Sequence, residues 1–262
     1  MYVMKFGGTS VTKPESVAAI VKLVKLGLAN QPVIVVSALS GVTDLLVKLS
    51  HSSDGDIREQ IFTELAFKHD SWIDNILADN DLAQIKAHQI VDDYFCELIE
   101  LLKSQIITSQ LELHDSVVAF GEKISSALIS FYLRLHDIGA EQLLATKCII
   151  TTSQFGGADF IDAPTKKASK LSILPLVKQG IVPVITGFIG ANKAGQTTIL
   201  GRGGSDYSAA IIGYAIQASE IQIWTDVNGV YSADPRVIKT AKLVKKLSYQ
   251  EAAELAMFGA KV

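Results

Sequence analysis

The sequence predicts an α/β protein, a three-layer αβα sandwich around a mostly parallel central sheet. Short segments rich in valine and isoleucine alternate along the chain with longer segments whose apolar residues recur at three- and four-residue steps. This alternation is typical of buried parallel strands joined by helices that cover both faces of a sheet. Hydrophobic residues also make up 48% of the 262 residues, which is enough for a large core. We therefore expect one large α/β domain or two lobes.

Six segments are predicted as strands because they are short, apolar and poor in charge. They are residues 2–6, 32–39, 142–150, 182–188, 197–200 and 220–225. The longest apolar run, residues 181–191, contains one proline and two glycines, so it is interpreted as a buried strand with its exit loop and not as a membrane span. Further on, Asn228-Gly229 lies between residues 224–227 and 230–231, which predicts a two-residue β-hairpin.

Helix-starting residues and helical periodicity are found between the strands. Thr12 and Glu15 have the spacing of a capping box, which predicts that the first helix starts there and runs to about residue 28. Ser248 and Glu251 have the same spacing and should start a last helix, which runs towards Gly259. The other segments with a helical pattern are residues 56–107, 114–135 and 205–218.

The composition argues against several classes of function. The net charge is −3 and the basic residues are dispersed, whereas a nucleic-acid surface needs a denser basic stripe with aromatic residues for stacking. Cys96 and Cys148 have no metal-ligand spacing and lie among apolar neighbours, which indicates buried thiols in a reducing compartment. The five histidines form no HExxH pair, and no signal peptide opens the chain. We expect a soluble, cytoplasmic protein with no nucleic-acid or membrane partner and no metal site of its own.

A lysine and two glycines follow the first predicted strand, in the segment Lys5-Phe6-Gly7-Gly8-Thr9-Ser10-Val11. Glycines let a bulky anion approach the backbone, and free N–H groups at the start of the next helix can bind it. The lysine supplies a point charge suited to phosphate. The segment is not a Walker A loop, because that motif has its lysine after the glycines. On the two glycines alone, an ordinary strand-to-helix turn explains the pattern equally well.

This segment resembles the N-terminal signature of the aspartate kinases (aspartokinases), a branch of the amino-acid kinase family. Two further segments resemble the same family in the same order: Gly201-Arg202-Gly203-Gly204-Ser205-Asp206, continuing to Ala210, and Trp224-Thr225-Asp226-Val227 with Val230-Tyr231 and Asp234-Pro235-Arg236. The resemblance covers residues 3–262, but only the catalytic portion of the family. It implies the amino-acid kinase fold, with a lobe for the amino acid at approximately residues 1–190 and a lobe for the nucleotide at residues 191–262. The family's regulatory ACT domains are absent from this sequence, so we expect a truncated catalytic domain or part of a longer polypeptide.

The resemblance implies an ATP-dependent kinase that converts ATP and L-aspartate to ADP and 4-phospho-L-aspartate, the first step of lysine, threonine and methionine biosynthesis. An aspartate side chain is already ionised at neutral pH, so the reaction needs no strong general base. Its difficulty is to bring an anion up to a polyanionic phosphate, which requires positive charge, magnesium and alignment. Mg²⁺ is expected to arrive with ATP and to be held mostly by phosphates and water. The family also implies a homodimer or a higher homo-oligomer.

The resemblance gives roles to individual residues. Lys5 matches the main catalytic cation, and Asp206 matches an organiser of the phosphoryl centre, although Asp206 is also suited to cap the helix that it starts. Arg202 offers a planar cation to the α-carboxylate of the amino acid, and Glu122 offers an anion to its ammonium group. The other residues that match the amino-acid site are Ser37, Thr43 and Ser205, and those that match the nucleotide site are Lys5, Gly7, Gly8, Thr225, Asp226, Tyr231, Arg236 and Lys261.

Three alternatives were weighed against this interpretation. A kinase of the same fold could act on glutamate, acetylglutamate, carbamate or UMP, but an N-acetylated or nucleotide substrate would give Glu122 no ammonium group to bind. A non-catalytic binding module is expected to have lost Lys5, Arg202 or Asp206, and all three are present. A dinucleotide-binding oxidoreductase is excluded because residues 201–206 lack the third glycine of its fingerprint and follow the wrong strand.

Overall fold

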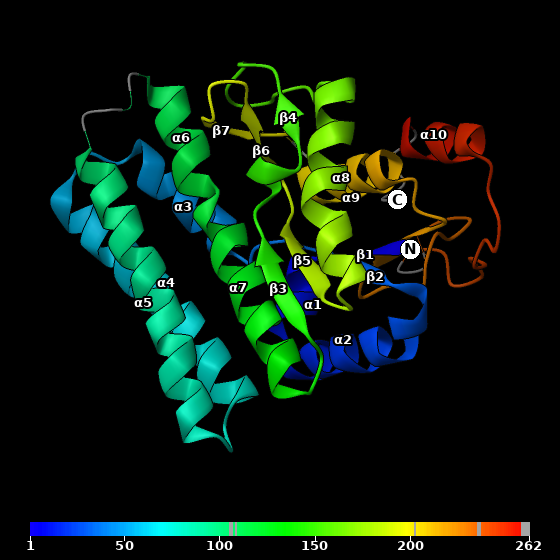
Figure 1. Cartoon of the computed structure of the whole chain (residues 1–262), viewed down its shortest axis with the longest axis horizontal. Coiled ribbons are helices and arrows are strands. Elements are labelled where there is room, and N and C mark those ends of the chain that lie inside the picture. The colour runs from blue at the N-terminus through cyan, green and yellow to red at the C-terminus, as the bar shows by residue number, and fades with distance from the viewer. Residues whose placement is uncertain (105–106, 108, 202, 235–236, 258–262) are drawn as a thin grey trace. The chain divides into compact units, whose positions relative to one another are not determined.

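The computed structural model describes residues 1–104, 107, 109–201, 203–234 and 237–257 (Figure 1). The chain forms two compact units, of which the first is Met1–Trp224 and the second begins at Thr225. The first unit contains the central sheet and most of the helices. The predicted division into a lobe for the amino acid and a lobe for the nucleotide stays a prediction.

Five parallel strands of the described residues form the central sheet. Their order is β3 (Ala140–Leu143), β5 (Val182–Thr186), β2 (Pro32–Val36), β1 (Tyr2–Phe6) and β8 (Ile221–Trp224). The last residues of neighbouring strands are level, because Phe6 pairs with Val36 on one side and with Trp224 on the other. The carboxyl ends of the strands therefore meet at one edge of the sheet, where ligands bind in open α/β folds. The predicted mostly parallel sheet is confirmed.

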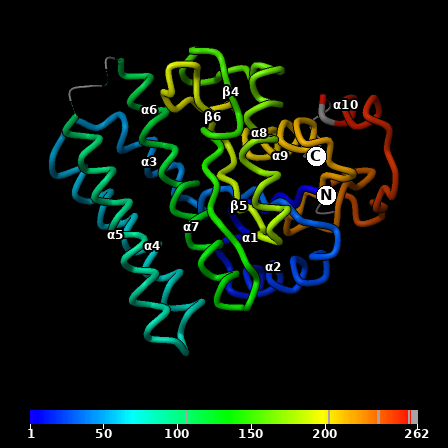
Figure 2. The backbone as a smooth tube through the Cα atoms, in the orientation of Figure 1, coloured from blue at the N-terminus to red at the C-terminus, as the bar shows by residue number. Residues whose placement is uncertain are grey.

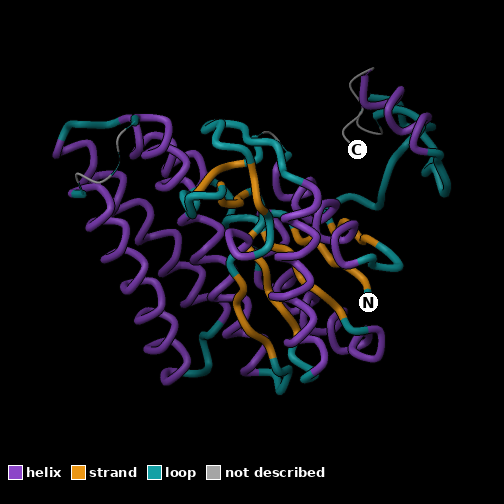
Figure 3. Tube along the Cα trace, turned by 45° about the horizontal axis from the view of Figure 1, so that its top comes forward, coloured by secondary structure: helices purple, strands orange, loops and turns teal. Residues whose placement is uncertain are grey.

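Helices cover both faces of this sheet, which confirms the predicted three layers (Figures 1 and 3). Along β1, Met4 and Phe6 enter a core on one face and Val3 enters a separate core on the other, as the two-residue period of a strand requires. The first core is closed by α2 (Pro14–Gly27), α3 (Val42–His51), α4 (Gly55–Ile76), α5 (Asp81–Lys103), α6 (Gln110–Val118) and α7 (Phe120–Leu135). The second core is closed by α8 (Asp162–Lys178) and α9 (Gly204–Ile216).

A second, smaller sheet consists of β4 (Ile150–Thr151), β6 (Ile189–Asn192) and β7 (Thr197–Ile199) in that order. The predicted single strand at residues 142–150 is therefore wrong, since β3 belongs to the central sheet and β4 to this one. A 3₁₀ turn, Ala145–Lys147, separates them, and Ala145 N donates to Thr186 Oγ1 at 2.7 Å. Of the three turn residues only Ala145 is buried, but apolar residues resume directly after the turn, so the pattern along the sequence did not show the break.

The first predicted helix is divided, and its predicted capping box is wrong. A short helix, α1 (Gly8–Thr12), follows the two-glycine turn, and α2 starts separately at Pro14. The Thr12 hydroxyl donates to Gly8 O at 2.6 Å and accepts from Ser40 N at 2.8 Å, so it does not cap α2. Pro14 starts α2 without a side-chain cap, since proline has no N–H and its fixed φ suits the first helical position.

The longer helices are confirmed in type but not in continuity. Residues 56–107 contain two helices, α4 and α5, which lie side by side (Figure 2). The side chains of Asp54 and Asn80 each accept from a backbone N–H of the following first turn, and so cap α4 and α5. Residues 114–135 are likewise divided between α6 and α7. Periodicity persists across such short breaks, so it predicts helices better than their ends.

The last helix starts as predicted. Before α10 (Tyr249–Met257), Ser248 N donates to Glu251 Oε2 at 2.7 Å, and Glu251 N donates to Ser248 Oγ at 3.2 Å. This reciprocal pair is a capping box. The expected extension to Gly259 lies outside the described residues.

The predicted hairpin at Asn228-Gly229 is wrong. Tyr231 forms an antiparallel bridge with Leu243, which lies later in the sequence, and not with the predicted partner at residues 224–227. Residues 221–224 form β8, which pairs with β1 in the first unit. Gly229 lies in a bend, and no strand flanks the Asn-Gly pair on either side within residues 225–230.

Within the described residues, one helical segment, Gln110–Leu135, is long and apolar enough by composition to cross a bilayer. Its most apolar window is 83% buried inside the fold. A core helix has the same properties, and the segment is interrupted between α6 and α7. The segment therefore gives little support to a membrane span.

Candidate active site

A cavity of about 650 Å³ lies at the carboxyl ends of the central strands. Its walls come from the ends of β1 and β2, the start of α3, the first turn of α7, and the segment between β7 and α9. It contains every predicted catalytic and amino-acid-site residue that the structure describes: Lys5, Ser37, Thr43, Glu122, Ser205 and Asp206. The fold thus brings together residues separated by up to two hundred positions in the sequence.

Lys5 and Asp206 form an ion pair in this cavity, with 2.7 Å between Lys5 Nζ and Asp206 Oδ1. The lysine side chain is only 10% exposed, whereas that of Asp206 is 50% exposed. Lys5 is the fourth residue of the buried strand β1, and Asp206 lies in the first turn of α9, where the helix dipole favours an anion. A buried cation is therefore held at the cavity by a carboxylate that remains accessible to solvent.

The glycines after β1 let the backbone come close to neighbouring groups. A side chain at Gly8 would bring its Cβ to 3.0 Å from Ala38 O, which is tighter than ordinary packing. At Gly7 a Cβ would lie 3.5 Å from Lys5 Nζ, in the space next to the ammonium group. Gly7 therefore leaves room next to the lysine, as the predicted phosphate cradle requires, whereas Gly8 allows the close approach of the Ala38 backbone. Their nucleotide contacts stay predictions.

Glu122 is almost completely buried in the first turn of α7, with 3% of its surface exposed. Its Oε1 accepts from Ala38 N at 3.1 Å, and its Oε2 has no hydrogen-bond partner. Burial raises the pKa of Glu122 to about 8, and the Ala38 N–H opposes that rise only in part. An unpartnered carboxylate oxygen on a residue that lines a cavity is suited to a cationic ligand, because a buried polar atom without a partner is costly.

The loop after β2 supplies the next wall. Ser37 N donates to Phe6 O at 3.1 Å, and Ser37 O accepts from Ser125 Oγ at 2.7 Å, so the segment is held between β1 and α7. Gly41 adopts a left-handed φ of 77° directly before α3, a conformation that favours glycine. This turn places Thr43 in the first turn of α3, at the cavity.

The segment before α9 closes the cavity on the opposite side. Gly201 and Gly203 both have left-handed φ values, of 78° and 72°. Ser205 packs so closely against Gly187 that a Cβ there would lie 2.7 Å from Ser205 Oγ. Arg202, the predicted partner of the α-carboxylate, lies outside the described residues.

Several residues of the cavity wall were not predicted from the sequence, among them Asp44, Gly156, Phe188 and Ile199. The Gly156-Gly157 pair could have indicated a loop of special backbone conformation, since Gly156 has a left-handed φ of 87°. Phe188 has a positive φ of 68° although it is not glycine, which no sequence pattern reveals. Ile199 could be read only as a buried strand residue.

The predicted nucleotide residues after β8 belong to the second unit. Thr225 Oγ1 donates to Asp226 Oδ1 at 3.2 Å, and Tyr231 forms the bridge to Leu243. Arg236 and Lys261 lie outside the described residues. The contacts of these residues with a nucleotide stay predictions.

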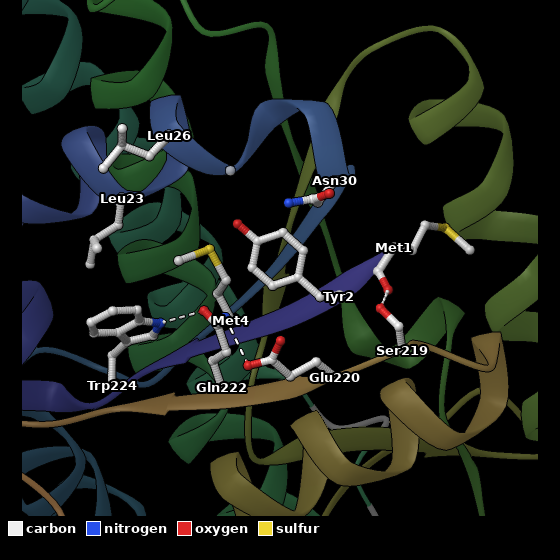
Figure 4. Close-up of a pocket in the computed structure, with 11 residues that line it drawn as sticks. Met1, Tyr2, Met4, Leu23, Leu26, Asn30, Ser219, Glu220, Gln222 and Trp224 are labelled. Atoms are coloured by element: carbon white, nitrogen blue, oxygen red, sulfur yellow. Dashed lines mark hydrogen bonds between the residues drawn. The ribbon is translucent and has the colours of Figure 1, made fainter.

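A second cavity, of about 420 Å³, lies beside the amino-terminal ends of β1 and β8 (Figure 4). Tyr2, Met4, Leu23 and Trp224 provide apolar walls, and Glu220 is the single charged residue that lines it. It contains no ion pair, and Trp224 is its one lining residue that ends a central strand, whereas α/β sheets bind ligands at the carboxyl ends of their strands. The cavity with Lys5 is therefore the better candidate.

Among the described residues, no group of three or more histidine, cysteine, aspartate or glutamate side chains lies close enough to hold a metal ion.

Comparison with known proteins places these observations in a family context. The model of the amino acid kinase family matches residues 1–262. The lysine-sensitive aspartokinase 3 of Escherichia coli (strain K12) is 36% identical over 264 residues, which cover 99% of this chain and 56% of that protein. The structure of E. coli aspartokinase III with lysine and aspartate has a TM-score of 0.87 at 33% identity, and covers 100% of this chain and 57% of that one.

The structure of the same E. coli enzyme with aspartate and ADP has a TM-score of 0.84 at 33% identity, and covers 99% of this chain and 57% of that one. The chain thus spans little more than half the length of the relatives that it matches.

Proposed function

The chain belongs to the amino acid kinase family, and on that premise we propose that it is an aspartate kinase. It would transfer the γ-phosphoryl group of ATP to the side-chain carboxylate of L-aspartate and release ADP and 4-phospho-L-aspartate. The similarity to E. coli aspartokinase III, whose structure holds aspartate and ADP, supports both substrates. The product would then enter the synthesis of lysine, threonine and methionine.

The observation that carries this proposal is that one cavity contains both a buried lysine and a buried carboxyl group. Lys5 is a buried cation at the end of β1, and Glu122 is a buried acid with one free oxygen on α7. A free amino acid that accepts a phosphoryl group needs both: an anion for its ammonium group and a cation near the attacking carboxylate. A substrate without an ammonium group would leave Glu122 Oε2 without a partner.

In the proposed reaction the aspartate carboxylate attacks the γ-phosphorus directly, since it is ionised at neutral pH. Lys5 would neutralise charge on the transferring phosphoryl group, and Asp206 would hold the Lys5 ammonium in position. The amino-terminal end of α9 adds a favourable field for an anion at the same place. Glu122 and Thr43 would orient the amino acid, with Ser37, Ser205 and Arg202 completing its site.

The nucleotide would occupy the region next to Gly7 and Gly8, with Thr225, Asp226, Tyr231, Arg236 and Lys261 as its further contacts. Mg²⁺ would come with ATP and neutralise phosphate charge. Because the described residues supply no cluster of three metal ligands, this arrangement fits an ion held mainly by phosphates and water.

A kinase for another carboxylic acid is the main alternative, since the fold alone does not choose the acceptor. The test is a hydroxylamine-trapping assay with Mg-ATP that compares L-aspartate, L-glutamate and N-acetylglutamate. The native chain is expected to give an aspartate-dependent hydroxamate and Lys5→Met is not. Lys22→Met, which removes an exposed lysine on α2, is the matched control and should behave as the native chain does. A signal with a different acid would keep the reaction and reject the substrate.

The quaternary and cellular setting follows the same proposal. We expect a homodimer or a higher homo-oligomer in the cytoplasm, and a catalytic unit that is one part of a longer polypeptide with regulatory domains. The short coverage of the relatives is consistent with such longer proteins.

A further inference from the structure

Asp115 lies on α6, outside the cavity, and its residue surface is fully buried. Its carboxylate accepts three backbone hydrogen-bond contacts: Gly156 N lies 3.1 Å from Oδ1 and 3.0 Å from Oδ2, and Ile199 N lies 3.1 Å from Oδ2. Burial raises the pKa of Asp115, and the two N–H groups oppose that rise. The buried carboxylate of Asp115 thus fixes the positions of the Gly156 and Ile199 backbones relative to α6.

Both segments that Asp115 holds belong to the wall of the cavity. Gly156 lies in the loop between β4 and α8, and Ile199 is the last residue of β7, just before the glycine-rich turn at 201–204. The two segments also contact each other, since Ala158 N donates to Ile199 O at 2.8 Å. Asp115 therefore links two wall segments that lie 41 and 84 positions away from it along the chain.

We propose that Asp115 is a positioning residue for the acceptor amino acid, because it fixes the wall formed by Gly156 and Ile199 in the arrangement that binds the substrate. This inference rests on the proposed function. Asp115 does not line the cavity itself, so it acts through the two backbone segments. A carboxylate suits this task because it presents acceptors on both oxygens, whereas an amide presents one acceptor and an NH₂ group that would face a backbone N–H.

The fold offers a matched comparison at Thr165, which makes a similar link without touching the cavity. Thr165 is buried on α8, and its hydroxyl accepts from Ile150 N and donates to Ile150 O, each at 3.0 Å. Neither residue lines the cavity. Loss of this link should lower stability without changing substrate binding, so Thr165→Val controls for a purely structural effect.

The test compares Asp115→Asn and Thr165→Val with the native chain in steady-state kinetics. Asp115→Asn is expected to raise the KM for aspartate by about tenfold, while kcat and the KM for ATP change by less than about threefold. Thr165→Val should leave all three within about twofold, even where thermal unfolding shows a comparable loss of stability. Hydrogen exchange should show faster exchange of the Gly156 and Ile199 amides in Asp115→Asn only.

The inference is overturned if Asp115→Asn changes the KM for aspartate no more than Thr165→Val does, or if the two amides keep their native protection. Should Asp115→Asn fail to fold, Asp115→Glu keeps the charge, moves it by one methylene and is held to the same criteria. Failure of the proposed function is a separate result: the native chain would then phosphorylate no aspartate. If it phosphorylates another acid, the KM comparison is made with that acid. If it phosphorylates no acid, Asp115 has no substrate to position and the inference falls with the proposed function.

Discussion

Under the proposed function, Glu122 should make the binding of aspartate dependent on pH, and the pKa of its carboxyl group gives the sign and the size of the effect. In the ligand-free protein burial raises its pKa to about 8, so most of the carboxyl groups carry a proton at neutral pH. The ammonium group of aspartate needs the ionised form. Binding must therefore remove the proton from Glu122, and the apparent affinity for aspartate should rise as the pH is raised towards 8.

The size of the effect follows from the ionised fraction. About one Glu122 in a hundred is ionised at about pH 6 and about half at about pH 8, so the apparent Kd for aspartate should be about fifty times higher at the lower pH. Glu122→Gln preserves the shape and the acceptor for Ala38 N but cannot ionise. Its affinity should be at least about a hundredfold lower than that of the native chain at pH 8, and independent of pH.

Calorimetric titration with aspartate is the appropriate assay, because it measures both the Kd and the number of protons released on binding. Titrations in buffers of different ionisation enthalpy should show release of nearly one proton per aspartate at about pH 6.5, falling to about half a proton at about pH 8. Glu122→Gln should release none. The α-ammonium group of free aspartate stays protonated over this range, so the protons come from the protein.

A native chain whose aspartate affinity is flat between about pH 6 and pH 8.5, with no proton released, would refute the reasoning. The same holds if Glu122→Gln retains the native pH dependence, since another group would then be titrating. Thermal unfolding of Glu122→Gln would show whether a loss of binding is only a loss of folding. Glu112→Gln is the matched control, because Glu112 lies on α6 and does not line the cavity.

Three further predictions concern catalysis and stability. Lys5→Met should lower kcat in the hydroxamate assay by about a thousandfold while the chain remains folded by circular dichroism. His69 is fully buried with its pKa lowered to about 4, chiefly by burial, so its contribution to stability is present above the ordinary value of 6.5 and is lost as the pH falls towards 4. Urea unfolding of the native chain should therefore show about 2 kcal/mol of extra destabilisation between pH 7 and pH 5 that His69→Leu lacks. Gly187→Ala would place a Cβ 2.9 Å from Val36 O and 2.7 Å from Ser205 Oγ, and should lower the free energy of unfolding by about 2 kcal/mol in calorimetry.

The parts of the fold predicted correctly are those in which local pattern and tertiary role agree. The strand at residues 2–6 and the capping box at Ser248 and Glu251 each carry their signal in a few adjacent residues. The strand expected at residues 142–150 failed because buried apolar residues lie on both sides of the three-residue turn at which the chain changes from one sheet to the other. Thr12 failed as a cap because its hydroxyl is bound by Ser40, a partner 28 positions away that no local pattern includes.

The candidate site shows the same limit. Glu122 and Lys5 were singled out by motif and chemistry, and the structure brings both to one cavity. Their electrostatic states were not predictable, because these depend on surroundings assembled from distant segments. The free Oε2 of Glu122 exists because α7 is packed against the loop after β2, and Asp115 gains its role only because Gly156 and Ile199 fold against α6.

Lys5 and Glu122 differ in their state before a ligand enters the cavity. Lys5 is already paired with Asp206, so its ammonium group is held in place at the cavity before any phosphate arrives. Glu122 has no such partner, and its negative charge forms fully only when an ammonium group enters. If the chain binds aspartate as proposed, its affinity would include the free energy of ionising Glu122, and an acid without an ammonium group would not recover that free energy. The cavity would thus discriminate among carboxylic acids mainly through the state of Glu122, since any of them could present a carboxylate to Lys5.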